Sequence, residues 1–206
     1  MTISKLQIEL ESFFLISIVA AGSLFLVIRN NQTQFSVGTV NSPLVTETIE
    51  EKTYSQISPN GENTVVMEVV SNKDNTYTYS FYTADGEGND RKFVFEKTLD
   101  DGKNMIIPYN TWSSDNKYFF VQENSDGKTS IFAFKATGEP FSETEKYFDV
   151  TDLFGKKETG YTFDEATGWA SESLIVINTK TENNEKGPSY WFEVPSKAVI
   201  QLSTKF

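Results

Sequence analysis

The side chains that could do chemistry in this chain are mostly carboxylates. The sequence holds 29 Asp and Glu against 18 Lys and Arg, and it contains no His and no Cys. His is the commonest general base and zinc ligand, so its absence makes serine–histidine and cysteine–histidine sites impossible within this chain. Two carboxylates at a defined separation can hydrolyse a glycoside without His. Nothing in the sequence pairs two particular carboxylates, and we predict no catalytic residue.

Two acidic turns have the composition of a cation-binding loop. Residues 84–90 read Ala-Asp-Gly-Glu-Gly-Asn-Asp, and residues 99–103 read Leu-Asp-Asp-Gly-Lys. Neither turn has the spacing of an EF-hand, and the bidentate Glu that closes an EF-hand loop is not in register. We therefore expect solvated hairpin loops here, and the sequence predicts no metal ligand and no cofactor-binding residue.

The acidic balance of the chain limits its partners. A net charge of −11 at pH 7 offers nothing to neutralise phosphates, which argues against binding to nucleic acid. The charge favours solubility over attraction to a specific basic partner. Without Cys, the redox compartment stays open.

A repeat organises the larger, C-terminal part of the chain. Its anchors are Ile57, Trp112 and Trp169, so the period is about 55 residues, close to that of kelch repeats. After each anchor come an apolar run, an aromatic strand, a turn and a further short strand. The apolar runs are Val65 to Met67, Tyr118 to Val121 and Leu174 to Ile177; the aromatic strands are Tyr77 to Tyr82, Ile131 to Phe134 and Tyr190 to Val194; the last strands are Phe93 to Phe95, Tyr147 to Val150 and Ala198 to Leu202. Each unit is predicted to be a small antiparallel meander.

Two details of the repeat predict local structure. Asn124-Ser125-Asp126-Gly127 is a hairpin signal, because Asp-Gly tolerates the positive φ that a two-residue turn requires. The runs Tyr118 to Val121 and Leu174 to Ile177 do not alternate between apolar and polar residues. This lack of alternation predicts burial on both faces of the strand.

The turns after the first two anchors resemble a known signature. Ser58-Pro59-Asn60-Gly61 and Trp112-Ser113-Ser114-Asp115-Asn116-Lys117 resemble the W-S-P-D-G-K signature of TolB-like (PD40, WD40-like) β-propeller blades. The third turn, Ala170-Ser171-Glu172-Ser173, has lost the Pro, the Asp and the Gly of that signature. The resemblance covers roughly residues 45–206. It implies an all-β domain of three antiparallel four-stranded, blade-like units at about residues 45–99, 100–155 and 156–206.

The number of units conflicts with a closed ring. Closed propellers typically have about four to eight blades, and only three units are visible here. Either a fourth blade has diverged beyond recognition, or a second chain completes the ring, or the units form an open stack or sandwich. All three arrangements stay open at the level of sequence.

The N-terminal region carries an apolar segment. Ser12 to Ile28 are 17 residues without a charge, and as a helix they would span roughly 25 Å. We predict a signal-anchor transmembrane helix within residues 1–29 and a polar stalk over residues 30–44. A signal peptide cleaved near Ala20 to Ser23 and a buried core helix are the alternatives. The flanking charges are nearly balanced, so the short N-terminal flank and the TolB-like resemblance favour an extracytoplasmic β domain, in the periplasm or at the cell surface.

Three tryptophans and one loop are candidates for interaction. Trp112 and Trp169 occupy equivalent repeat positions, which predicts packing between units, with a ligand-stacking platform as the alternative. Trp191 lies on the opposite strand face from its apolar neighbours and becomes an interface candidate if it is exposed. Asn183 to Pro188 form a loop that departs from the repeat, and such insertions are either binding surfaces or simply tolerated.

The sequence supports a function class rather than an activity. The leading hypothesis is a membrane-anchored, non-enzymatic β-propeller-like module that binds a protein partner outside the cytoplasm. The alternative is a structural surface or envelope subunit that assembles through its own repeat, as a closed dimer of six blades or as an open filament. A glycoside hydrolase that uses carboxylates is the third hypothesis.

Overall fold

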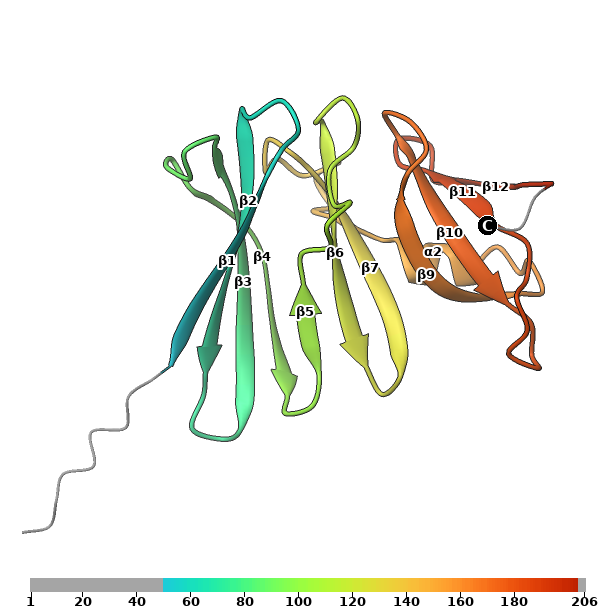
Figure 1. Ribbon diagram of the computed structural model, residues 1–206, viewed down its shortest axis with the longest axis horizontal. Coiled ribbons are helices and arrows are strands. Elements are labelled where there is room, and N and C mark those ends of the chain that lie inside the picture. Colours follow the sequence, from blue (N-terminus) through green and yellow to red (C-terminus); the bar gives the residue numbers. More distant parts are fainter. Residues whose placement is uncertain (1–49, 204–206) are drawn as a thin grey trace, which may run out of the picture. The chain divides into compact units, whose positions relative to one another are not determined.

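The structure, a computed structural model, describes residues 50–203 (Figure 1). The predicted anchor, with Ser12 to Ile28, and the predicted stalk lie outside the described residues. Within the described part of the chain, no helix is long and apolar enough to cross a membrane.

Three four-stranded antiparallel sheets make up this part of the chain (Figure 1). Strands that pair within a sheet also follow one another in sequence, so each sheet is an up-and-down meander, and no sheet described between residues 50 and 203 closes into a barrel. The first sheet holds β1 (Glu51–Ile57), β2 (Asn63–Ser71), β3 (Thr76–Asp85) and β4 (Lys92–Asp100); the second holds β5 (Asn104–Ile106), β6 (Tyr118–Ser125), β7 (Lys128–Lys135) and β8 (Phe148–Asp149); the third holds β9 (Thr162–Trp169), β10 (Leu174–Lys180), β11 (Tyr190–Glu193) and β12 (Ala198–Gln201). The predicted all-β class with three antiparallel four-stranded, blade-like units is confirmed.

Turn residues set the register of the meanders. β6 and β7 pair as far as Ser125 and Lys128, which leaves Asp126 and Gly127 as a two-residue loop. Their φ angles are 53° and 73°. A loop with two positive φ angles has the twist of the flanking strands, and Asp-Gly adopts it at low cost. The predicted hairpin is therefore confirmed.

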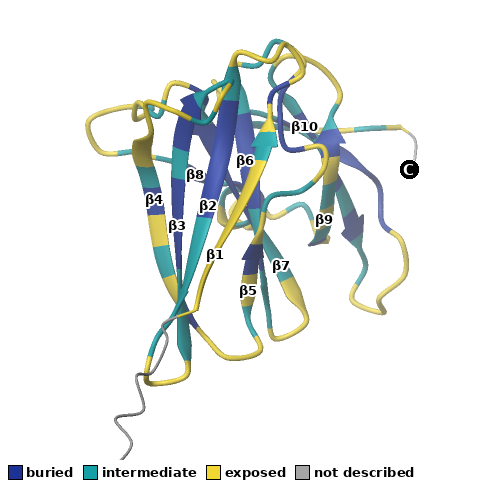
Figure 2. Ribbon diagram, turned by 60° about the vertical axis from the view of Figure 1, so that its left-hand side comes forward, coloured by how far each residue is buried: buried dark blue, intermediate teal, exposed yellow. Residues whose placement is uncertain are grey.

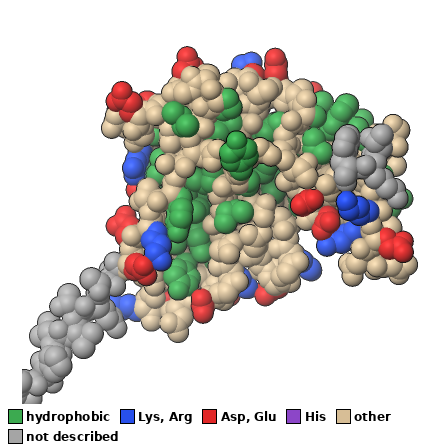
Figure 3. Space-filling model, viewed as in Figure 1, with side chains coloured by type: hydrophobic (Ala, Val, Ile, Leu, Met, Phe, Trp, Pro, Cys, Tyr) green, Lys and Arg blue, Asp and Glu red, His purple; other side chains and the backbone are tan. Residues whose placement is uncertain are grey.

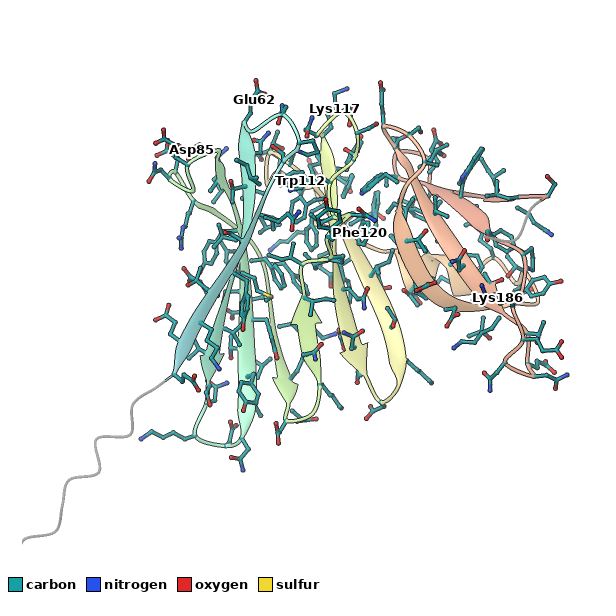
Figure 4. The ribbon with its side chains drawn as sticks, viewed as in Figure 1. Glu62, Asp85, Trp112, Lys117, Phe120 and Lys186 are labelled. Atoms are coloured by element: carbon teal, nitrogen blue, oxygen red, sulfur yellow. The ribbon has the colours of Figure 1, made fainter. Side chains whose placement is uncertain are left out.

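Apolar side chains fill the two spaces between the sheets. The second sheet lies in the middle, and its strand β6 has both faces covered, because Phe119, Phe120 and Val121 are all fully buried. Phe119 and Val121 belong to the cluster shared with the first sheet, whereas Phe120 belongs to the cluster shared with the third. Figure 4 shows Trp112 and Phe120 lying toward different neighbouring sheets. Burial on both faces of Tyr118 to Val121 was expected, and it is confirmed for these three residues.

The third sheet differs from the expectation on one face. Ile175 and Ile177 are fully buried against the second sheet, but Leu174 and Val176 are only half-buried. The prediction of burial on both faces is wrong for Leu174 to Ile177. No further sheet among residues 50–203 packs on that side, so the alternate side chains of β10 stay accessible.

The last strand of the second unit is shorter than expected. Tyr147 to Val150 was predicted as a strand, but β8 is only Phe148–Asp149. The Asp149 side chain accepts a hydrogen bond from the backbone N–H of Asp152 at 2.9 Å and caps the short helix α2 (Val150–Gly155). Because Asp is a strong N-cap residue, the chain turns into a helix where the strand was expected to continue.

Candidate functional site

The turn that follows Trp112 is built around a buried hydroxyl group. Ser113 Oγ accepts a hydrogen bond from the Tyr118 backbone N–H at 3.0 Å and donates one to Asp115 Oδ1 at 2.8 Å. Burial disfavours the charged form of Asp115, but hydrogen bonds from Lys117 and Ser113 outweigh that effect and hold its pKa below the ordinary value. The residues that resemble the propeller signature therefore bind one another.

The equivalent turn of the first sheet repeats this arrangement. Ser58 Oγ accepts from the Asn63 backbone N–H at 3.0 Å and donates to Asn60 Oδ1 at 2.7 Å. In the third sheet, Ala170 has no hydroxyl, and its backbone N–H donates to the carbonyl of Leu174 at 2.8 Å. The side-chain part of the turn is thus present in two sheets and lost in the third.

One tryptophan links the second sheet to the first, and another links the third sheet to the second. Trp112 Nε1 donates to the carbonyl of Gln56 at 3.1 Å, and Trp169 Nε1 donates to the carbonyl of Thr111 at 3.0 Å. Each acceptor is the residue just before the anchor of the preceding unit. Gln56 adds a second bridge, since its Nε2 donates to the carbonyl of Tyr109 at 3.1 Å. The expected packing of Trp112 and Trp169 between units is confirmed.

A groove crosses all three sheets at these bridges. It lies where the first strand of each sheet, β1, β5 or β9, leads toward the second, and its volume is about 700 Å³. We call it the first-strand groove. Its walls include Ile57, Tyr109, Asn110, Trp112, Gly168 and Trp169.

The first-strand groove has the chemistry of a binding surface. Tyr109 is 86% exposed and Ile57 is 52% exposed, although both are large apolar side chains. In Figure 3, hydrophobic side chains gather on the face that carries β1 and β5. The polar wall residue Asn110 already donates to the carbonyl of Thr167 at 3.1 Å. Apart from the Tyr109 phenol, the lining residues carry no titratable side chain.

A second cavity continues from the groove along β1. Its volume is about 580 Å³, and Gln56 lines both spaces. The other walls include Tyr54, Met67, Val69, Tyr79, Met105 and Ile107. Methionine, aromatic and aliphatic side chains therefore continue the apolar lining of the first-strand groove from the end of β1 to the middle of that strand.

The most enclosed carboxylates lie elsewhere and have structural partners. Glu123 is buried and forms an ion pair with Lys97, which reaches it from the first sheet. Asp149 caps helix α2, and burial raises the pKa of its carboxyl above the ordinary value. Neither residue lines the first-strand groove or the cavity beside β1.

The two acidic turns are closed by their own hydrogen bonds. Asp85 Oδ1 accepts from the backbone N–H groups of Glu87 and Asn89, at 3.0 and 2.7 Å. Asp100 forms an ion pair with Lys103 at 3.2 Å. Among residues 50–203, no three acidic side chains come together in a way that could hold a metal ion.

Trp191 and the loop of residues 183–188 lie away from the first-strand groove. Trp191 is half-buried on the outward face of the third sheet, where it pairs with Val176 on one side and Ile200 on the other. Lys186, in this loop, lies at the opposite end of the sheets from the turn that carries Lys117 (Figure 4). Neither Trp191 nor any residue of this loop lines the groove.

Sequence reasoning missed two exposed residues of the groove. Ile57 was read only as a repeat anchor, and Tyr109 was not singled out. The available signal was Pro108, which follows β5 and cannot donate to a sheet, so the residues after it had to leave the strand. The chain matches no protein-family model, and no curated protein matches its sequence.

Proposed function

We propose that this chain is a non-enzymatic binding module whose first-strand groove takes up part of a protein partner. In this proposal the repeat is a TolB-like, propeller-like arrangement, Ser12 to Ile28 anchor the chain in a membrane, and the β domain is displayed outside the cytoplasm. The observation that carries the proposal is the groove itself. It crosses three sheets, exposes Tyr109 and Ile57, and carries neither a carboxylate nor an amine on its walls.

The wall chemistry suits recognition better than catalysis. Aromatic side chains bury a large area on binding and lose little rotational freedom, so they dominate the energetics of interfaces. A hydrolytic site requires an acid and a base close to the reacting bond. The enclosed carboxylates Glu123 and Asp149 are instead engaged by Lys97 and by helix α2.

Photocrosslinking tests this proposal. A benzoylphenylalanine at position 109 replaces a side chain that is already aromatic and exposed, in the full chain expressed in its own cells. We expect one discrete crosslinked protein, which disappears when Ile57→Asp is added, because the charge would sit in the apolar groove. The matched control carries the photoreactive residue at Lys128, an exposed position outside the groove.

The proposal fails if the crosslink is absent. It also fails if Ile57→Asp leaves the crosslink unchanged, or if position 128 captures the same protein with equal yield. Thermal unfolding of each variant shows whether the fold is intact, since Ile57 is half exposed and its replacement should leave the core in place.

Self-assembly is the second candidate, and a different surface favours it. Val176, Trp191 and Ile200 form a cross-strand row on the outward face of the third sheet. Ile200 is 45% exposed, and rows of this kind often mark interfaces. Light scattering of the full chain in mild detergent would give a dimer or larger species that Trp191→Glu converts to monomer; a concentration-independent monomer would rule this candidate out.

A further inference from the structure

Among residues 50–203, no strand pairs with the outer edge of β1. The carbonyl of Glu50 accepts from the Ser71 N–H at 3.2 Å, and the Ser58 N–H donates to the carbonyl of Asn63 at 2.7 Å. In an antiparallel pair, alternate residues direct their N–H and C=O groups toward the same neighbour. The even-numbered residues of β1 therefore face β2, and Thr53, Ser55 and Ile57 direct theirs outward.

No described residue takes up these outward groups. β1 is the end strand of the first sheet, and within residues 50–203 it pairs with β2 alone. The next strand in sequence on that side, β5, pairs with β6. Unpaired N–H and C=O groups on an edge strand are a template for another extended chain.

β1 is also the least protected of the described sheet edges. It is seven residues long, its register with β2 has no bulge, and residues 54–57 include neither a charge nor a proline. The other inner edges are blocked: β5 is only three residues long, and β9 has register shifts in its pairing with β10. The far edges are charged (β4) or short (β8 and β12). Charges, prolines, bulges and shortness are the usual means by which proteins prevent edge pairing, and β1 has the fewest of them.

The two faces beside the β1 edge differ in chemistry. Tyr54 is on the same face as Met67 and is 50% exposed over the apolar cavity of about 580 Å³. Thr53 and Ser55 are on the other face and are exposed. In Figure 2, β1 is largely exposed while the neighbouring β2 is mostly buried or half-buried. A strand added here would meet the apolar cavity on the Tyr54 face, and on the other face it would meet Thr53, Ser55 and, at the end of β1, the exposed Ile57.

We infer that an extended peptide segment of the partner pairs antiparallel with β1 and becomes a fifth strand of the first sheet. This inference rests on the proposed function, because it names the part of the partner that the groove receives. Alternate side chains of the segment are apolar and enter the cavity beside β1, and the residues between them are polar. At about 3.4 Å per residue, β1 accommodates a segment of about seven residues. The end of that segment reaches the first-strand groove at Ile57.

A designed peptide tests the pairing without knowledge of the natural partner. The probe is Lys-Thr-Val-Thr-Val-Thr-Val-Thr-Lys with capped ends and a fluorophore, titrated with the full chain in mild detergent and followed by anisotropy. In antiparallel pairing, residues opposite one another share a face, so the threonines are opposite Thr53 and Ser55 and their N–H groups point at β1. A peptide N-methylated at the threonines keeps every side chain and loses those donors. We expect saturable binding of the first peptide and none of the second.

Two substitutions at Ser55 form the matched pair on the protein side. Ser55→Pro removes an N–H that points away from β2, so the ladder within the sheet is kept, and Ser55→Ala removes the side chain alone. We expect Ser55→Pro to weaken binding about tenfold or more, which corresponds to about 1.4 kcal/mol, and Ser55→Ala to leave it within about twofold. If Ser55→Pro does not fold, the N-methylated peptide on the unaltered chain decides the question.

Three binding results would overturn the inference, and so would one result on assembly. They are absence of binding by the first peptide, equal binding by the N-methylated peptide, and equal binding by Ser55→Pro. A dimer that forms through β1 without peptide and is abolished by Ser55→Pro would also overturn it, because the occupant would then be a second copy. The Tyr109 crosslink separates the two proposals: if it depends on Ile57 but not on Ser55, the groove binds a partner and β1 does not pair with it.

Discussion

Replacement of Trp112 by phenylalanine tests how the first and second sheets are joined. Trp112 is only 7% exposed, packs with its ring centroid 5.3 Å from that of Phe119, and donates its indole N–H to Gln56. Phenylalanine keeps one aromatic ring next to Cβ but removes the hydrogen bond and the outer part of the indole. The loss therefore falls on the contact between the two sheets.

The expected cost follows from these contacts. The loss of buried carbon atoms should cost about 1–2 kcal/mol of stability, at about 0.8 kcal/mol per carbon. The hydrogen bond contributes about 0.5–1.5 kcal/mol. The free energy of unfolding should fall by about 1.5–3.5 kcal/mol, which for a domain of this size lowers the melting temperature by roughly 3–14 °C.

Denaturant unfolding followed by far-ultraviolet circular dichroism measures the change. Trp169→Phe breaks the equivalent bond to Thr111 and should behave in the same way. Trp191→Phe is the control, because Trp191 is half-buried on the outward face of the third sheet, where no other sheet of residues 50–203 packs; it should cost less than about 1 kcal/mol. Equal losses for Trp112→Phe and Trp191→Phe, or a loss under about 0.5 kcal/mol for Trp112→Phe, would refute the reasoning.

Three further substitutions test the local structure. Ser113→Ala leaves a backbone N–H of β6 unpaired and should cost about 1–3 kcal/mol. The substitution also removes a hydrogen bond that lowers the pKa of Asp115 in the folded state. A carboxyl with a lowered pKa stabilises the fold at neutral pH, and this stability is lost as the pH falls through the pKa of the folded state. The variant should therefore lose less stability than the unaltered chain on acidification below about pH 4. Asp149→Asn keeps an N-cap residue and removes a carboxyl whose pKa is raised by burial. The variant should be more stable at pH 7 and should lose this advantage as the pH falls through the raised pKa. A series of unfolding curves at different pH values measures the change. Gly86→Ala would place its Cβ 1.9 Å from a carbonyl oxygen of the β1–β2 turn and should cost at least about 1–3 kcal/mol, whereas Gly155→Ala meets nothing within 4 Å and should be neutral or stabilising in thermal unfolding.

The β class and the three units could be predicted because local signals agreed with one another. Asp126-Gly127 specified its own turn, and the unbroken apolar run containing Phe119 and Phe120 required cover on both faces. The equivalence of Trp112 and Trp169 was visible as spacing in the sequence. These features depend on residues close together in the chain, so a single sequence displays them.

The groove and the free edge could not be predicted in the same way. Tyr109 becomes a groove residue only because the carbonyl beside it is held by Gln56, more than fifty residues away. The outward direction of the Ser55 N–H depends on the register between β1 and β2. The apolar run Leu174 to Ile177 predicted burial on both faces of its strand. Burial of the second face requires a further sheet beyond the third, and the sequence pattern does not show how many sheets there are.

Residue-resolved amide exchange would test the central claim, that β1 and the first-strand groove form the binding face, most directly. The full chain in mild detergent is measured with and without the capped threonine–valine peptide. We expect the N–H groups of Thr53, Ser55 and Ile57 to exchange rapidly in the chain alone and to become protected with peptide, while those of Tyr54 and Gln56, already bonded to β2, change little. Protection that appears on the outward face of the third sheet instead, or no change along β1, would contradict the account.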